Sequence, residues 1–97
     1  MDKNTKLIML YDYYSGLLTD KQQEYFEDYY FNNLSLSEIS ENNDVSRNAV
    51  HKQIKEVEEK LNYYEEKLNL LDKNKKISEI LKNCFDEKLV KQIENLI

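Results

Sequence analysis

The sequence predicts an all-α fold, in which a helix-turn-helix domain carries a long recognition helix and further C-terminal helices. The first reason is composition. The 97 residues include no proline and one glycine, so the chain is poor in the turn residues that a β-sheet needs. The second reason is periodicity, because apolar residues recur along most of the chain at the intervals of amphipathic helices. We expect a single helical domain over residues 1–97, with the helix-turn-helix core at about 18–61 and the long helix and C-terminal helical part at about 46–97.

Two helices are predicted before the motif. The first ends at Gly16, which we place at the C′ position. Its apolar face is formed by Leu7, Leu10, Tyr11 and Tyr14. Thr19 begins the second helix, with Gln22 as its capping-box partner. The apolar side of this second helix is formed by Tyr25, Phe26, Tyr29 and Tyr30. At helical spacing we interpret these tyrosines as core and interface residues rather than as groups that stack on bases.

Residues 34–61, LSLSEISENNDVSRNAVHKQIKEVEEKL, have the pattern of two helices joined by a tight turn. Ser35 caps the first of these helices, and Glu38 completes a capping box. The segment 42–44 then interrupts the helix with asparagine and aspartate, which tolerate the left-handed conformation. Ser46 caps the recognition helix. The two helices share an apolar seam formed by Leu36, Ile39, Val50, Ile54 and Val57.

Residues 18–61 resemble the fourth region of bacterial sigma factors. The shared features are an L-T-x-x-Q opening, an S-L-x-E-I-A middle and a V-S-R-x-x-V recognition helix, with Ser40 where the pattern has alanine and Asn43 where glycine is common. The whole chain resembles the YlxM family of small helix-turn-helix proteins in its length, its opening YDYYSGLLTDKQ and its long helix past Leu61. This second resemblance implies a role in the signal recognition particle pathway, with the particle's RNA or its GTPase as partner.

A basic surface is predicted on the recognition helix. Five side chains point away from the stripe of Val50, Ile54 and Val57 at about 100° per residue, and these are Arg47, Asn48, His51, Lys52 and Lys55. Arginine pairs with guanine, asparagine with adenine, and lysine with phosphate, so we predict nucleic-acid binding here. The sigma resemblance points to the same positions. The competing interpretation is an ordinary solvated helix face. Glu56, Glu58 and Glu59 follow, so we expect the contact to end beyond Lys55.

The apolar seam of the recognition helix continues as a heptad pattern through Val50, Ile54, Val57, Leu61, Tyr64, Leu68 and Leu71. A pattern of this length predicts that the helix extends beyond the motif and meets another apolar helix. Two partners remain open, namely the chain's own C-terminal helices folding back and a second copy of the chain. Both can hold at once if the C-terminal helices of one chain pack on the other. We expect a homodimer held partly by Leu61, Tyr64, Leu68 and Leu71.

Two short helices are predicted at the C-terminal end. After a polar break at residues 72–74, the first has its apolar residues at Ile77, Ile80, Leu81, Cys84 and Phe85. Asp86 caps the second, whose apolar residues are Leu89, Val90, Ile93, Leu96 and Ile97.

Charge and composition narrow the function. The net charge is −5, and residues 1–45 alone carry three lysines against nine acids, which disfavours tight binding to phosphate. Cys84 is the single cysteine, and the chain has neither a secretory signal nor a long apolar run, so we expect a cytoplasmic protein that does not bind membranes. We predict no enzyme, no cofactor and no catalytic or metal site, because the phosphate loops, nucleophile sets and clustered ligands of such proteins are missing from the sequence. A lone His51 does not make a metal site.

Two functional classes remain. We predict a helix-turn-helix DNA-binding regulatory protein associated with the signal recognition particle pathway. The alternative is an accessory protein that binds the particle's RNA or its GTPase and does not bind DNA. The partner distinguishes them, because a regulator recognises a fixed duplex sequence whereas an accessory factor recognises a folded RNA or a protein surface.

Overall fold

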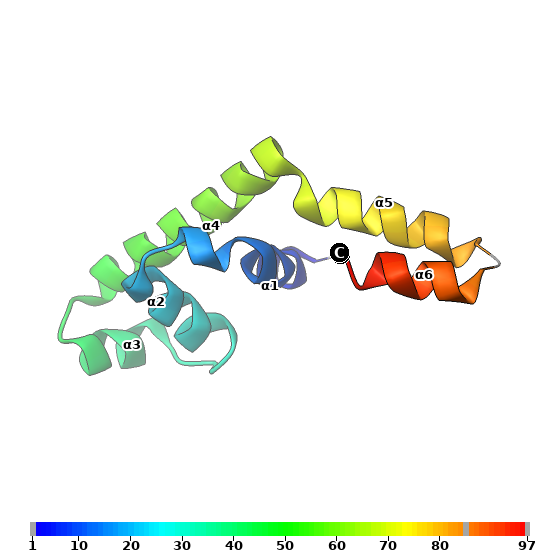
Figure 1. Ribbon diagram of the computed structural model, residues 1–97. Helices are drawn as coiled ribbons and strands as arrows, with labels where there is room; N and C mark the ends of the chain where they lie inside the picture. The colour runs from blue at the N-terminus through cyan, green and yellow to red at the C-terminus, as the bar shows by residue number, and fades with distance from the viewer. Residues whose placement is uncertain (1, 85, 97) are drawn as a thin grey trace.

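The computed structural model describes residues 2–84 and 86–96, and this part of the chain forms six α-helices, one 3-10 turn and no strand (Figure 1). The elements are α1 (Lys3–Tyr14), the 3-10 turn η1 (Ser15–Leu17), α2 (Asp20–Tyr30), α3 (Leu36–Asn43), α4 (Arg47–Leu68), α5 (Leu70–Lys82) and α6 (Glu87–Glu94). The predicted all-α fold, with α3 and α4 as the helix-turn-helix pair, is confirmed.

Side chains at the helix starts determine where the helices begin. Thr19 and Gln22 form the predicted capping box of α2, and Ser35 and Glu38 form that of α3. Ser46 Oγ accepts a hydrogen bond from the Ala49 amide at 3.0 Å and caps α4. Asp86 caps α6 in the same way through the Leu89 amide, at 3.1 Å. Each cap satisfies an amide that the helix leaves without an internal partner.

Gly16 does not have the predicted role. The helix α1 ends at Tyr14, and the 3-10 turn η1 follows directly. Gly16 lies inside this turn and does not have a positive φ angle. The tighter turn itself satisfies the last carbonyl groups, since the Leu18 amide donates to the Ser15 carbonyl at 3.0 Å. The C′ prediction for Gly16 is therefore wrong.

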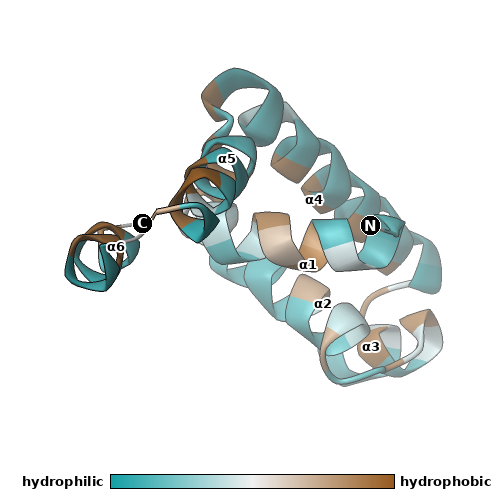
Figure 2. Cartoon of the chain, turned by 90° about the vertical axis from the view of Figure 1, so that its right-hand side faces the viewer, coloured by the Kyte–Doolittle hydropathy of each residue, from teal (hydrophilic) through white to brown (hydrophobic). Residues whose placement is uncertain are grey.

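The core lies mainly between α1 and α4. Nine buried residues form its larger cluster: Leu7, Leu10, Tyr11, Tyr14, Leu18, Phe26, Val57, Leu61 and Leu71. A second cluster joins α2, α3 and the start of α4 through Tyr25, Ile39, Val50 and Ile54. In Figure 2 the apolar segments of α1 and α4 face the space between these two helices. The long helix thus finds an apolar partner in the N-terminal helix of its own chain.

The heptad pattern does not run through one helix to Leu71. Asn69 adopts a left-handed conformation with φ 57° and ends α4, and α5 starts at the next residue. The polar segment 72–74 lies inside α5, so the predicted break there is wrong. The Glu65 carboxylate explains why α5 begins at Leu70. It accepts hydrogen bonds from the Leu71 and Asp72 amides at 3.2 and 3.1 Å, and so caps α5 from the preceding helix.

The helices α5 and α6 extend away from the other four, and the molecule measures 55 × 25 × 23 Å (Figure 1). Leu81 is buried here, but no residue of Glu87–Glu94 is. Ile80 and Leu96 are 70% and 83% exposed. Phe85 and Ile97, which the sequence assigns to the apolar faces of these helices, lie outside the described residues.

Candidate nucleic-acid interface

The turn between α3 and α4 sets the direction of the recognition helix. Asp44 closes α3 with a left-handed backbone, φ 53° and ψ 45°, as the Asn-Asn-Asp segment predicts. The Val45 amide donates to the Ser40 carbonyl at 3.1 Å, and Ser40 itself is buried. The chain therefore leaves α3 by a defined route and enters α4 at the Ser46 cap.

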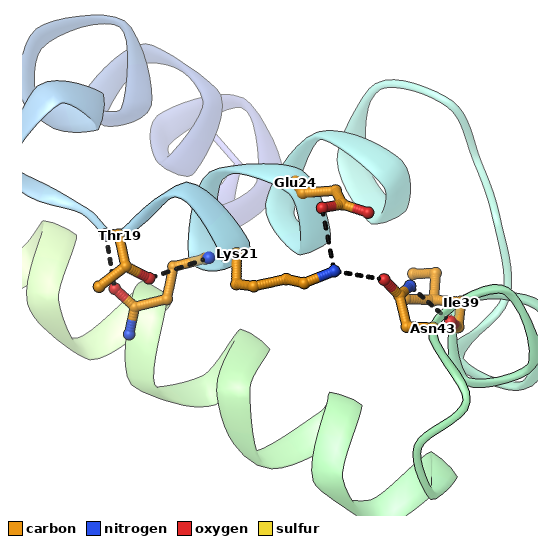
Figure 3. A network of polar contacts seen from close by, with 6 residues as sticks. Thr19, Lys21, Glu24, Ile39 and Asn43 are labelled. Atoms are coloured by element: carbon orange, nitrogen blue, oxygen red, sulfur yellow. Dashed lines mark hydrogen bonds and ion pairs between the residues drawn. The ribbon is translucent and has the colours of Figure 1, made fainter.

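A polar network also fixes the end of α3 to the start of α2 (Figure 3). Lys21 Nζ donates to Asn43 Oδ1 at 2.9 Å and forms an ion pair with Glu24 at 3.3 Å. Asn43 Nδ2 donates in turn to the Ile39 carbonyl at 2.8 Å. Because Ile39 is completely buried, the network joins the surface of α2 to the core of the helix-turn-helix pair.

All five predicted contact residues lie exposed on one side of α4, and we call them the basic face: Arg47, Asn48, His51, Lys52 and Lys55. The opposite side of the same turns holds Val50 and Ile54, which are 0% and 3% exposed. The helical spacing of about 100° per residue, applied to the sequence, thus gives the correct orientation of these five side chains. Nothing acidic occurs between residues 46 and 55, so the first turns of α4 present cationic and amide groups to solvent.

Three of the nine acids in residues 1–45 lie at helix starts, where they have structural roles. Asp2 accepts a hydrogen bond from the Thr5 amide at 2.8 Å and caps α1, and this amide bond holds the pKa of its carboxyl below the usual value. Asp20 lies in the first turn of α2, and Glu38 completes the capping box of α3. Negative charge at these positions is favoured by the helix dipole. A third of the acids upstream of α4 thus lie where they stabilise helix starts.

Glu58 is the residue whose position sequence reasoning missed. The charge pattern marks it only as one of three acids at which the nucleic-acid contact ends, whereas its side chain is buried, with 8% exposure. Its Oε2 atom accepts a hydrogen bond from the Tyr30 hydroxyl at 3.0 Å, and Lys55 Nζ lies 3.7 Å from Oε1. Burial, and then the charge of Glu58, raise the pKa of Tyr30. Residue 58 lies four positions after Ile54 and three before Leu61, so helical spacing puts it on the buried side of α4. This spacing could have predicted the burial of Glu58.

A cavity of about 200 Å³ adjoins the basic face. His51 and Lys55 line it together with residues of α1, α2 and α3, among them Lys3 and Tyr29. Lys3 and His51 are 48 positions apart in the chain, so no local pattern indicates that they share a site. Arg47, Asn48 and Lys52 are not among its lining residues.

The four residues predicted to join two copies of the chain have different environments. Leu61 and Leu71 are buried in the core beside α1, with exposures of 0% and 5%. Tyr64 is half-buried against the same core, and Leu68 is 45% exposed. A contact between two copies in this conformation would therefore be limited to Leu68, the free part of Tyr64 and their exposed neighbours Tyr63 and Leu70.

Across residues 2–84 and 86–96, no His, Cys, Asp and Glu side chains gather in threes or more as a metal ion would require. Within the same ranges, no helix has the length and apolar composition that crossing a bilayer demands.

Comparison with known proteins gives a consistent result. A family model described as "Putative helix-turn-helix protein, YlxM / p13 like" matches residues 1–97. The chain is 44% identical over 104 residues to a UPF0122 protein of Halalkalibacterium halodurans, an alignment that covers 99% of this chain and 95% of that protein. It is 51% identical over 83 residues to a UPF0122 protein of Caldanaerobacter subterraneus subsp. tengcongensis, covering 81% of this chain and 70% of the relative. For the UPF0122 protein of Malacoplasma penetrans the identity is 44% over 89 residues, covering 92% and 83%.

Proposed function

Because the chain belongs to the YlxM/p13-like family of helix-turn-helix proteins, we propose that it is a DNA-binding regulatory protein that places the basic face of α4 in the major groove. The observation that carries this proposal is the exposure of the basic face on the first turns of a capped helix. Arg47 and Asn48 have the chemistry that reads guanine and adenine edges, and Lys52 and Lys55 have the chemistry that holds phosphate. Backbone amides of the first turn add phosphate donors.

The test is a salt-titrated binding assay with the Arg47→Ala, Lys52→Ala double variant. We expect it to lose duplex binding while keeping its helicity and melting temperature, because both side chains are exposed. Lys73→Ala, Lys88→Ala is the matched control, since it removes the same charge from exposed positions of α5 and α6. Lys52→Ala alone should lower the slope of log affinity against log salt by about 0.9. Equal affinities for the double variant and the control would refute the contact assignment.

Asn48→Ala tests base reading separately from phosphate binding. If Asn48 reads an adenine edge, its loss relaxes the preference for one base pair by about 1–3 kcal/mol and leaves the salt slope unchanged. Selection from a randomised duplex library measures this preference. A lower salt slope with unchanged preference would instead assign Asn48 to the phosphates.

The second candidate function is an accessory role in the signal recognition particle pathway, in which the protein binds the particle's RNA or its GTPase. The net charge of −5 favours the form in which it binds the GTPase, because tight binding to the phosphates of DNA or RNA needs an excess of cations. Crosslinking in the native cytoplasm, followed by identification of the attached nucleic acid and protein, separates the candidates. A promoter fragment supports the regulator, and the particle's RNA or GTPase supports the accessory role. The Arg47→Ala, Lys52→Ala variant should lose whichever nucleic-acid product the wild type gives.

A homodimer remains part of the proposal. Two linked basic faces would gain affinity through effective concentration, which compensates for the small cationic surface of one chain. Exposed Leu68, together with Tyr64 and their neighbours at the end of α4, is the proposed contact between the copies.

A further inference from the structure

The cavity beside the basic face combines three kinds of group that recognise nucleotides. Lys3, His51 and Lys55 provide cations or hydrogen-bond donors, Tyr29 provides an aromatic ring, and Glu58 provides a carboxylate. These residues come from three different helices, α1, α2 and α4. The basic face alone has neither a tyrosine ring nor a carboxylate, so the cavity can recognise chemistry that the basic face cannot.

The Glu58 carboxylate has acceptor capacity to spare. Its Oε2 atom is engaged by the Tyr30 hydroxyl at 3.0 Å. Among the described residues, Oε1 is paired only with Lys55 Nζ, and the distance of 3.7 Å is longer than a hydrogen bond. An ionised carboxylate offers about four lone-pair positions. A ligand that donates a hydrogen bond inside the cavity would therefore find an acceptor already held in place.

Tyr29, which the sequence pattern places among the core and interface residues, lies outside both core clusters and lines the cavity. It is 38% exposed, and it meets the ring of Tyr30 edge to face, with centroids 5.1 Å apart and an interplanar angle of 84°. Tyr30 is itself anchored through its bond to Glu58. The exposed ring of Tyr29 thus has a fixed neighbour, and aromatic side chains of this kind stack on bases irrespective of sequence.

We propose that this cavity binds one unpaired nucleotide whose base carries an exocyclic amino group. The base stacks on Tyr29 and its amino group donates to Glu58, while Lys3, His51 and Lys55 hold the flanking phosphates. Cytosine is the preferred base, because carboxylates accept hydrogen bonds from its N4 amino group. A base inside a regular duplex has its faces stacked and its pairing edge occupied, so the nucleotide comes from a loop, a bulge or a single strand. The inference rests on the proposed function, since it adds a base pocket beside the same basic face.

The first test compares two labelled ligands by fluorescence anisotropy: a fully paired stem and the same stem with a short cytidine bulge. We expect Tyr29→Ala to weaken binding of the bulged stem roughly tenfold and to leave binding of the paired stem unchanged. Tyr29→Phe keeps the ring and should bind like the wild type. Tyr13→Ala is the matched control, because Tyr13 of α1 is 38% exposed, like Tyr29, but does not line this cavity. RNA and DNA versions of both ligands show which nucleic acid supplies the nucleotide.

The second test changes the base preference. Glu58→Gln keeps an oxygen that can accept from Tyr30 but replaces the other carboxylate oxygen, the one near Lys55, with an amide donor. A cytidine bulge should then bind more weakly, and a uridine bulge, whose base presents a carbonyl in place of the amino group, should bind more tightly. If Tyr29→Ala and Glu58→Gln leave the affinity for both bulged ligands unchanged, the cavity proposal is overturned. Loss of paired-stem binding in Arg47→Ala, Lys52→Ala would still support the basic face in that case, so the two failures are distinguishable.

Discussion

At the scale of single residues, Tyr14 and Glu65 determine how the two halves of the molecule are joined. The Tyr14 hydroxyl donates to Glu65 Oε1 at 2.6 Å and accepts from the Leu70 amide at 3.1 Å. Glu65 also accepts from the Leu71 and Asp72 amides. The first amides of α5 are thereby satisfied by side chains of α1 and α4, which replaces the side-chain cap that Asn69 does not provide.

Glu65→Ala should lower the free energy of unfolding by about 1–3 kcal/mol, because it leaves amides and a buried hydroxyl without their acceptor. Denaturant unfolding measures the loss, and amide hydrogen exchange at Leu71 and Asp72 locates it. Glu66→Ala is the control, since the neighbouring glutamate is exposed. Equal effects of the two substitutions would show that the capping bonds do not stabilise the junction.

The raised pKa values of three tyrosines lead us to predict that the free energy of unfolding falls at alkaline pH. Burial is the main cause that raises the pKa of Tyr11, Tyr14 and Tyr30 above the ordinary value of 10.0, and a hydrogen bond to a glutamate adds to it. The folded protein therefore holds these protons more tightly than the unfolded chain. Their contribution is complete below about pH 10 and is lost as the pH rises above it. Urea unfolding between about pH 9 and pH 11 should show the decline. Tyr30→Phe should flatten it, whereas an unchanged slope would contradict the raised pKa of this residue.

At the scale of elements, local sequence determines most of what the structure contains. The helix caps at Thr19, Ser35 and Ser46 each depend on a partner three residues further along the chain. The left-handed Asp44 follows two asparagines. These features can therefore be predicted from short stretches of sequence. Gly16 and Asn69 show the limit of such reasoning. A 3-10 turn competes with a glycine C-cap at Gly16, and the end of α4 depends on Tyr14, which is 56 residues away from Leu70. Nothing local carries that information.

Ile39→Asp should unfold the helix-turn-helix pair. Ile39 is completely buried among Val50, Ile54 and Tyr25, so a carboxylate placed there would be surrounded by apolar side chains. Burying an unpaired charge costs several kcal/mol, which is comparable with the total stability of a small domain. Circular dichroism melting measures the effect, with Ser37→Asp as an exposed control on the same helix. A cooperative melt like that of the wild type would contradict the burial of Ile39.

At the scale of the whole molecule, the sequence predicts which residues are apolar but not which helices meet. The heptad pattern correctly indicates that α4 needs an apolar partner, and the partner is α1, which the pattern does not identify. The basic face could be read from the helical period alone. The cavity beside it could not, because Lys3, Tyr29 and Glu58 become neighbours only when three helices pack together.

The proposed homodimer makes a prediction about mass. Light scattering at micromolar concentration should give twice 11.7 kDa for the wild type and 11.7 kDa for Leu68→Glu, because a charge on the exposed end of α4 disfavours an apolar contact. Leu61 is unsuitable for this test, since a charge there would disrupt the core. Ile80→Glu is the control, as it places the same charge on an exposed apolar position of α5. A monomeric wild type would exclude the dimer under these conditions.

The contacts of α1 with the junction of α4 and α5 can form only late during synthesis of the chain, because that junction is made long after α1. Tyr11 can stack on Phe26 soon after both are made, but Tyr14 must wait for Leu70, 56 residues later. At about 5–20 residues per second, a ribosome needs roughly 3–11 s to cover that interval. Through this time the nascent chain exposes apolar side chains of its first helix, and it can assemble the helix-turn-helix pair before that helix is fully covered. A slower ribosome therefore lengthens the time for which the first helix is incompletely covered.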